Sequence, residues 1–349
     1  MLQTSNRQTT PIGQNKPNDM KNQNVVLLLS VIAGCALLAG CSKAKDAEGQ
    51  SNNSTSSGAA SAESGSSAMM KINWPLGQKY LMRMEVDQIV ETHVPNQPQP
   101  VKQQVNLTQR FNLSALKALD NDGRQLELEF KDQKINVKQG ELTVMSFDSR
   151  DNASTEGNPV APLLTKMIGA RIQYQTDAGG KVEKVEGVEE LMTRIGFNRK
   201  SQQHAAFKDF VSEETLKRYG SLGEMMPNRV VKVGEDWSIK EQVPSTIGTL
   251  DIQMNYTFKK WEQRDDRRCA LIKADGVITP APGPGGGSPV KVQKGTISGD
   301  IWFDPELGMV VGQNLDQNMT LDINAGGQKM TSDLKQQIRM AMEDVVPPR

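Results

Sequence analysis

The chain has 349 residues, of which 41 are basic and 41 acidic, so it carries no formal net charge. This balance argues against the basic surface by which proteins bind nucleic acid, and the length suffices for one large domain or two ordinary ones. Residues 1–40 hold three basic and one acidic side chain, which leaves 38 basic and 40 acidic side chains, a net charge of −2, in the remainder. We therefore expect no nucleic-acid partner.

Residues 25–40 form an uncharged run rich in Val, Leu, Ile and Ala, and Lys21 precedes it. A membrane-spanning helix needs about 20 apolar residues, so this run is short for a span. It is typical of the apolar region of a secretory signal, with Lys21 as the positive residue before it. The run predicts export of the chain, with residues 1–40 as the signal peptide. Met20 suits the start of such a signal better than Met1, and both starts remain open.

The run ends in Leu38-Ala39-Gly40-Cys41, which resembles the lipobox of bacterial lipoproteins. The small residues suit a peptidase site, and the thiol of Cys41 accepts a diacylglyceryl group. Cleavage between Gly40 and Cys41 frees an amine for a further acyl chain, such as palmitate. Stable anchoring takes more than one chain, because each buried CH₂ contributes only about 0.8 kcal/mol. We predict a lipid on Cys41; a plain cleaved signal or an uncleaved anchor is the alternative.

Three cysteines occur in the chain. Cys35 follows a similar motif, but cleavage there would leave an apolar segment on the product, so Cys41 is the better lipid site. Once Cys35 is removed and Cys41 is acylated, Cys269 has no partner for an internal disulfide. Cys269 lies in an apolar run, which favours a small buried residue over a reactive thiol.

The remainder divides by composition. Residues 42–68 are rich in Ser, Gly, Ala and Asn, which is typical of a flexible tether, and we expect folded structure to begin near Lys71. The predicted division is a lipidated tether (41–70), a first β half (71–200), a helical connector (201–228) and a second β half (229–345).

Alternation of apolar and polar residues predicts antiparallel strands with one buried face. The phase of the alternation slips after Phe130, which predicts a β-bulge near Asp132. The apolar sets are Met82, Met84, Val86 and Val90; Val101, Val105, Leu107, Phe111 and Leu113; Leu126, Leu128 and Phe130; Ile135 and Val137; Ile252, Met254, Tyr256 and Phe258; Met309, Val311, Leu315, Met319, Leu321 and Ile323; and Met330, Leu334, Ile338, Met340 and Met342.

Turn and cap residues predict the remaining elements. Short helices are expected over residues 159–168 and 187–195, with a hairpin around the turn at 178–180. Ser212 is a suitable N-cap for a third helix, and Pro227 ends it.

The order of these signals repeats along the chain. Gly77-Gln-Lys-Tyr80 matches Gly234-Glu-Asp-Trp237, since each has a glycine turn, two polar residues and an aromatic residue that enters a strand. The strand, aspartate turn and strand of residues 171–182 likewise match residues 299–310, although a shared hairpin habit would give the same pattern. The repeat predicts a mainly β protein with two similar curved antiparallel sheets, of half-barrel or open-barrel type, and a few short helices between them.

These turns carry a resemblance to a family. Residues 162–192, the helix after Ser212, the VKVGEDW turn at 231–237 and the WFDPELG hairpin at 302–308 resemble a family of uncharacterised bacterial proteins with a domain of unknown function. Its members are often lipoproteins, and the resemblance covers roughly residues 72–345. It implies the fold and supplies no catalytic residues. The long one-sided strands are also similar, at fold level, to the half-barrels of periplasmic lipoprotein carriers.

Catalytic and metal-binding patterns are weak. His93 and His204 have no Cys or carboxylate at ligand spacing, and neither a G-x-S-x-G elbow nor a P-loop occurs. We expect no catalytic residues, no metal and no cofactor, although a hydrolase with dispersed carboxylates stays as an alternative. The methionines of the apolar sets favour core packing over a copper–thioether site.

Five glutamines interrupt the apolar sets. Buried amides need hydrogen-bond partners, so these residues either line a partly wet pocket or face solvent near strand ends. They are Gln88, Gln103, Gln109, Gln317 and Gln336.

Together these features predict an exported protein of the cell envelope, held to the membrane by the lipid on Cys41. Ser42 is compatible with an outer-membrane position facing the periplasm in a Gram-negative cell. The first hypothesis is a non-enzymatic binding or scaffold module with an envelope protein as partner. The second is a carrier that holds a lipid or other apolar ligand between curved sheets.

Overall fold

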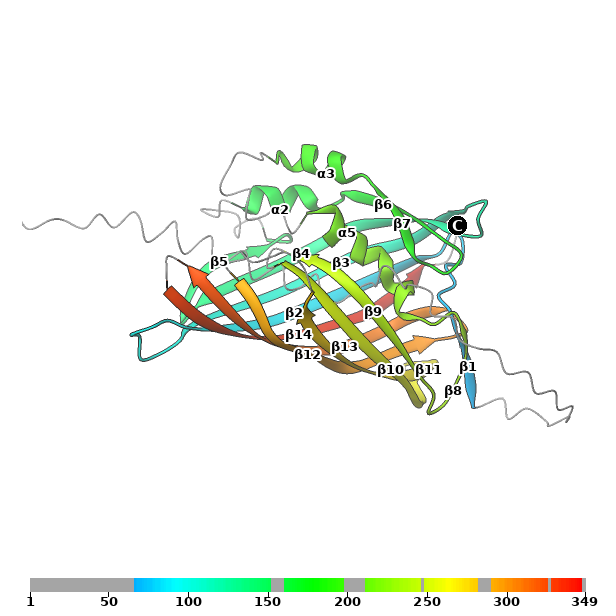
Figure 1. Ribbon diagram of the computed structural model, residues 1–349. Helices are drawn as coiled ribbons and strands as arrows, with labels where there is room; N and C mark the ends of the chain where they lie inside the picture. The colour runs from blue at the N-terminus through cyan, green and yellow to red at the C-terminus, as the bar shows by residue number, and fades with distance from the viewer. Residues whose placement is uncertain are drawn as a thin grey trace, which may run out of the picture.

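The computed structural model describes residues 66–151, 160–197, 211–245, 248–281, 290–325 and 328–346. Strands dominate it, which confirms the mainly β class predicted from the sequence (Figure 1). The strands are β1 (Ser67–Met70), β2 (Lys79–His93), β3 (Val101–Ala118), β4 (Arg124–Gln139), β5 (Leu142–Asp148), β6 (Arg171–Thr176), β7 (Val182–Glu186), β8 (Arg229–Lys232), β9 (Asp236–Ser245), β10 (Gly248–Arg264), β11 (Arg267–Pro280), β12 (Val290–Asp304), β13 (Met309–Ala325) and β14 (Gln328–Val346).

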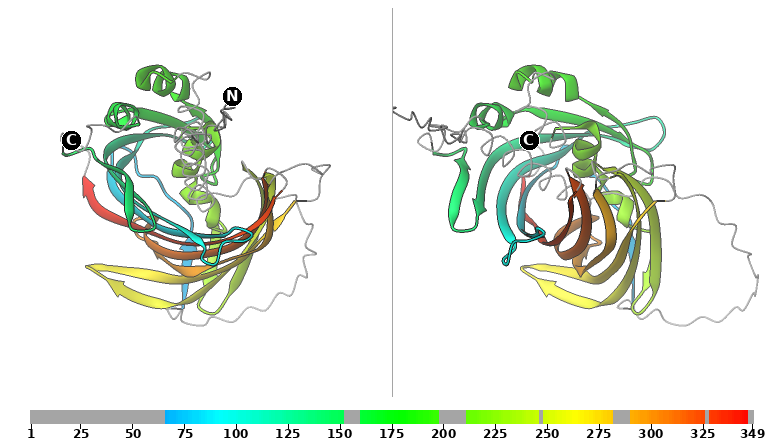
Figure 2. Two further views of the ribbon diagram at one scale, coloured as in Figure 1. Left: turned by 90° about the vertical axis from the view of Figure 1, so that its left-hand side faces the viewer. Right: turned by 60° about the vertical axis from the view of Figure 1, so that its left-hand side comes forward.

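All of these strands except β1 and β8 belong to one twelve-stranded sheet. The strand order is β7-β6-β4-β3-β2-β14-β13-β12-β11-β10-β9, and β5 pairs with β4. The chain forms two antiparallel meanders, which meet where β14 pairs with β2. The two curved halves expected from the sequence are therefore joined into one continuous curved sheet (Figure 2). In the described residues, the outermost strands β7 and β9 do not pair with each other, so the sheet is open.

The register explains the slip in the alternation. Arg110 of β3 faces Asp132 of β4, but the next residue, Phe111, faces Phe130. Lys131 is therefore an extra residue on β4, which confirms the bulge predicted near Asp132. The bulge lets the apolar residues on both sides of it point to the same face of the sheet.

The helices are short, and the N-terminal end of one of them is capped by the residue predicted from the sequence. They are α2 (Ala161–Met167), α3 (Val188–Ile195), α5 (Glu213–Gly220) and the 3-10 helix η3 (Ser221–Met225). The Oγ atom of Ser212 accepts a hydrogen bond from the backbone N–H of Thr215 at 3.2 Å, as predicted for the N-cap of α5. None of the helices in the described part of the chain has the length and hydropathy of a membrane span.

The matched turns have similar local geometry in both halves. Gly77 and Gly234 have φ angles of 77° and 87°, in the left-handed region that favours glycine. The Oδ1 atom of Asp177 accepts backbone hydrogen bonds from Gly179 and Lys181 (2.9 Å each). In the second half, Oδ1 of Asp304 accepts hydrogen bonds from the backbone N–H groups of residues 306 and 307.

The remaining two strands form a separate ribbon. β1 pairs antiparallel with β8, with Met70 opposite Arg229. The first described strand thus begins at Ser67, a few residues before the Lys71 at which folded structure was expected from the sequence. A strand of four residues is too short to show alternation, but Ala68 and Met70 are buried and hold it in place.

Candidate functional site

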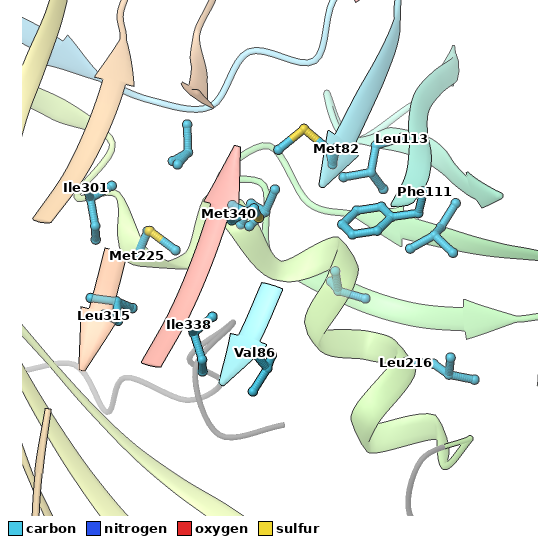
Figure 3. Close-up of a cluster of buried hydrophobic side chains, with 14 of the residues drawn as sticks. Met82, Val86, Phe111, Leu113, Leu216, Met225, Ile301, Leu315, Ile338 and Met340 are labelled. Atoms are coloured by element: carbon cyan, nitrogen blue, oxygen red, sulfur yellow. The ribbon is translucent and has the colours of Figure 1, made fainter. Parts of the chain in front are cut away.

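The inner face of the sheet, which we define as the face that α5 packs against, is the candidate site. Tyr219 of α5 makes edge-on contacts with the rings of Phe111 and Phe130, with centroids 5.2 and 6.0 Å apart. Part of the buried apolar cluster, including Leu216 of α5 and Met225 of η3, is drawn in Figure 3. The central strands contribute Met82, Val86, Val90, Val105, Leu107, Phe111, Leu113, Leu315, Met319, Leu334, Ile338 and Met340.

Three glutamines interrupt this apolar face in one row. Gln317 of β13 lies directly opposite Gln336 of β14, which in turn lies directly opposite Gln88 of β2. Directly opposed residues in antiparallel strands have Cβ atoms about 4.5–5.5 Å apart, so the three amides lie close together. All three side chains are buried, with at most 3% of their surface exposed. We call these three residues the amide row.

The hydrogen bonding of the amide row is incomplete. Neither Oε1 nor Nε2 of Gln336 has a hydrogen-bond partner, although both atoms are buried. Oε1 of Gln317 also lacks one, and its Nε2 lies 3.3 Å from the Sδ atom of Met319, a weak acceptor. Leaving a buried polar group unpaired costs about 1–3 kcal/mol. The centre of the inner face therefore presents both donors and acceptors that the described chain does not use.

A second group of amides connects the sheet to α5. The hydroxyl of Tyr219 donates to Oε1 of Gln109 at 2.6 Å, and Nε2 of Gln109 lies 3.4 Å from Oε1 of Gln133. Nε2 of Gln133 is buried without a hydrogen-bond partner. This chain of hydrogen bonds fixes α5 over β3 and β4 and ends in another unused donor.

Residues 213–225, which comprise α5 and η3, form a bridge segment between the two edges of the sheet. On one side, the hydroxyl of Tyr174 in β6 donates to the carbonyl of Leu216 at 2.8 Å, and the N–H of Val182 in β7 donates to Glu224 at 3.2 Å. On the other side, Nε1 of Trp237 in β9 donates to the carbonyl of Met225 at 3.0 Å. The bridge segment thus connects the two edges of the sheet across its open side (Figure 2).

Buried charges lie on this bridge segment. Arg218 and Glu241 of β9 form an ion pair at 3.9 Å, and both side chains are almost fully buried. Burial raises the pKa of Glu224, although hydrogen bonds from Ser221 and from the N–H of Val182 oppose this shift. The Oε2 atom of Glu224 is buried without a hydrogen-bond partner. Charges placed in this way are costly to keep buried and are weak evidence for stability.

Some of the site residues predicted from the sequence lie within the described part of the structure, and others lie outside it. Gly40 and Cys41, the predicted cleavage and lipid sites, lie outside the described residues, as does His204. His93 is exposed and lies 3.7 Å from Asp333 across the strand pair. Cys269 is buried, and burial raises the pKa of its thiol to about 11, as expected of an unreactive cysteine. Within the described ranges, no three His, Cys, Asp or Glu side chains gather as metal ligands would.

The five predicted glutamines are all buried, so the solvent-facing alternative does not apply to them. Sequence reasoning missed two further buried glutamines, Gln133 and Gln313. Gln313 has the same parity as Val311 and Leu315, so the alternation contained the necessary signal. Gln133 lies just after the bulge and has the same parity as Ile135 and Val137, so the alternation contained the signal for this residue as well.

Residues 121–310, more than half of the chain, match the family of unknown function DUF6263. The chain belongs to DUF6263. The family match includes the bridge segment, whereas the amide row of this DUF6263 protein lies outside it. No curated protein matches the sequence.

Three solved structures are distantly similar to the DUF6263 chain. A structure of lipovitellin with its lipid interactions is 8% identical, with a TM-score of 0.42, and covers 79% of this chain and 26% of its own. A Bacteroides fragilis protein with a YmcC-like fold, described as exported, is 10% identical, with a TM-score of 0.25, and covers 76% and 97%. An outer membrane channel from Pseudomonas putida is 9% identical, with a TM-score of 0.19, and covers 77% and 97%.

Proposed function

We propose that this DUF6263 member is a lipid-anchored binding protein of the cell envelope that holds an elongated amphipathic ligand against the inner face of its sheet. The observation that carries the proposal is Gln336, whose amide is buried at the centre of an apolar face with both polar atoms unpaired. A core that served packing alone would have no use for such a side chain, because an apolar residue of similar size costs less there.

The chemistry of the inner face defines the ligand class. The Met, Val, Leu and Ile side chains suit acyl chains or other apolar groups, and methionine adapts to irregular shapes. A purely apolar ligand would leave the amide of Gln336 unpaired, so the ligand carries a hydrogen-bonding group such as an ester, amide or hydroxyl. Gln336 offers one acceptor and a donor group, and Oε1 of Gln317 offers a further acceptor.

Access to the amide row requires movement. Its atoms are buried, so a ligand reaches them when the elements that cover the inner face separate. Hydrogen bonds from Tyr174, Val182 and Trp237 hold the bridge segment to the sheet edges, together with the Arg218–Glu241 ion pair and the Tyr219–Gln109 hydrogen bond. Each hydrogen bond contributes only about 0.5–1.5 kcal/mol net and the segment is not a strand of the sheet, so we expect this segment to be the moving part.

The anchor on Cys41 is supported by the motif Leu38-Ala39-Gly40-Cys41 after the apolar run. It holds the protein in the envelope, at the outer membrane facing the periplasm in a Gram-negative cell. Labelling with a fatty-acid probe in an exporting host tests the anchor. The native chain becomes labelled and a Cys41→Ser chain does not; equal labelling of the two would refute acylation at this residue.

Native mass spectrometry of the full chain, purified gently from an exporting host, tests the ligand. We expect a stoichiometric adduct whose organic extract contains an amphipathic molecule. The Gln336→Leu chain should lose most of the adduct, whereas Gln337→Leu, altered at the next residue on the opposite face, should retain it. A bare mass that persists after incubation with envelope lipids would replace the proposal with a scaffold module.

A further inference from the structure

The ribbon of β1 and β8 has one buried face and one apolar exposed face. Ala68, Met70 and Val231 are buried, whereas Met69 and Val230 lie directly opposite each other and are 51% and 52% exposed. Exposed apolar side chains are normal when scattered singly, but two opposed across a strand pair form a continuous surface. Val233, just after β8, is exposed as well.

More exposed apolar residues lie at the same end of the sheet. We call it the β1 end, where β2 and β9 begin and β14 finishes. Leu76 bridges to Ala115 at the end of β3, which places it there together with the neighbouring exposed Leu116. Val346 of β14 pairs with Lys79, the first residue of β2, and is exposed as well. Most of the large exposed apolar side chains in the described residues are therefore at the β1 end.

The charges around the ribbon suit phosphate groups. Lys71 and Lys232 are exposed beside the apolar pair. Arg229 of the ribbon forms an ion pair with Glu235, so the charge of this acidic side chain is already compensated. Lysine side chains at a membrane surface lay their apolar stems along the interface and place their amines among the headgroups.

The ribbon lies close in sequence to Cys41, the predicted lipid site, and this position indicates the surface that its exposed face contacts. β1 is the described element nearest in sequence to Cys41, and it begins 26 residues after that cysteine. In Figure 1 the ribbon projects from the rest of the fold at the β1 end. We infer that the exposed face of the β1–β8 ribbon docks onto the phospholipid bilayer that carries the anchor, with Met69 and Val230 inserted among the acyl chains. This inference rests on the anchor of the proposed function and is independent of the bound ligand.

Docking fixes the orientation of the protein. The β1 end faces the bilayer, and the opposite end of the sheet, where β2 turns into β3, points away from it. A tether alone would allow all orientations, so a fixed orientation distinguishes docking from simple anchoring.

A fluorophore tests the contact in the full lipidated chain, reconstituted in vesicles of phosphatidylethanolamine and phosphatidylglycerol. An environment-sensitive dye on Met69→Cys should shift to shorter wavelength and lose at least half of its emission to spin-labelled lipids. The matched control is Val277→Cys, an equally exposed apolar position near the end of β11 that lies away from the β1 end, whose dye should stay in water. Equal, weak quenching at both positions would overturn the inference. A shift at position 69 that depends on protein concentration without vesicles would replace the bilayer with a second copy of the chain.

A second measurement keeps the two proposals separate. A chain with Met69→Asp and Val230→Asp should bind vesicles at least tenfold more weakly than the Val277→Asp control when neither carries the lipid. Its melting temperature and its ligand adduct should be unchanged, since both residues lie on the exposed side of the ribbon. If mass spectrometry finds no acyl group on Cys41, the bilayer contact is tested by the same quenching measurement with the dye on the unlipidated chain. If the protein carries no ligand adduct but the dye at position 69 is still quenched, the ligand proposal fails and the docking inference stands.

Discussion

Gln336 and Gln337 are neighbours on β14, and their side chains point to opposite faces of the sheet. On the outer face, Nε2 of Gln337 donates to Asp316 at 3.0 Å, and its Oε1 accepts from Arg339. On the inner face, the same two atoms of Gln336 have no hydrogen-bond partner. The outer amide can also use water, whereas the inner amide cannot. At these two positions, the sheet pairs the amide for which pairing matters less and leaves unpaired the amide for which it matters more.

Other polar side chains on the outer face are also paired, as Gln337 is. Glu343 contacts Arg83 and Arg110 at 3.3 and 3.1 Å, and Arg339 contacts Glu85 at 3.4 Å. These pairs are solvent-accessible and link neighbouring strands. An unpaired amide at Gln336 inside and a paired one at Gln337 outside are the reverse of what packing alone favours, and such reversals are expected at functional sites.

The largest effect on stability should come from removing a large side chain from the inner face. Phe111→Ala removes a fully buried ring that contacts Tyr219, and we expect a loss of about 3–5 kcal/mol in unfolding free energy, measured by urea denaturation. The outer-face counterpart is Trp302→Ala, which removes a contact with Arg264 and a hydrogen bond to Glu262. Its loss should be about 1–2 kcal/mol. Equal losses would mean that the two faces are packed alike.

The next effect has the opposite sign. Gln336→Leu removes an unpaired buried amide, so we expect the ligand-free chain to gain about 1–3 kcal/mol in unfolding free energy. Gln337→Leu breaks paired contacts on the outer face and should be neutral or slightly destabilising. Gain of stability together with loss of the bound ligand would identify Gln336 as kept for binding. A loss of stability in Gln336→Leu would show that the amide is satisfied in solution.

The sequence predicts the faces of the strands but not their neighbours. Alternation placed Val86, Ile338 and the amide row on the buried side, because side-chain direction has a period of two residues. Pairing of β2 with β14 joins residues near opposite ends of the chain, and no local pattern encodes that contact. The hydrogen-bond state of Gln336 depends on this pairing and on the elements above the face. The sequence therefore identified the glutamines as anomalous and left their arrangement in one row undetermined.

A smaller effect should depend on pH. Burial raises the pKa of Glu224 above its ordinary value of 4.5, so the folded state holds its proton at a pH where the unfolded state has released it. The wild-type chain should lose stability relative to Glu224→Gln as the pH rises above 4.5, until the folded carboxyl also ionises. Below that range both states are protonated and the difference should vanish. Urea denaturation of both chains from pH 4 to pH 8 measures this, and a pH-independent difference would exclude a buried carboxylate at the bridge segment.

The smallest effect belongs to the outer face. Glu343→Gln weakens two accessible ion pairs, with Arg83 and Arg110, and we expect it to cost about 0.2–1 kcal/mol at low salt. Because salt screens exposed charges, the cost should disappear near 1 M salt, where the Debye length is about 3 Å. The gain from Gln336→Leu should survive the same salt, since no ionic group and no solvent-accessible atom is involved. If salt abolished both effects, water would reach the amide row, and the contrast between Gln336 and Gln337 would be one of charge rather than of burial.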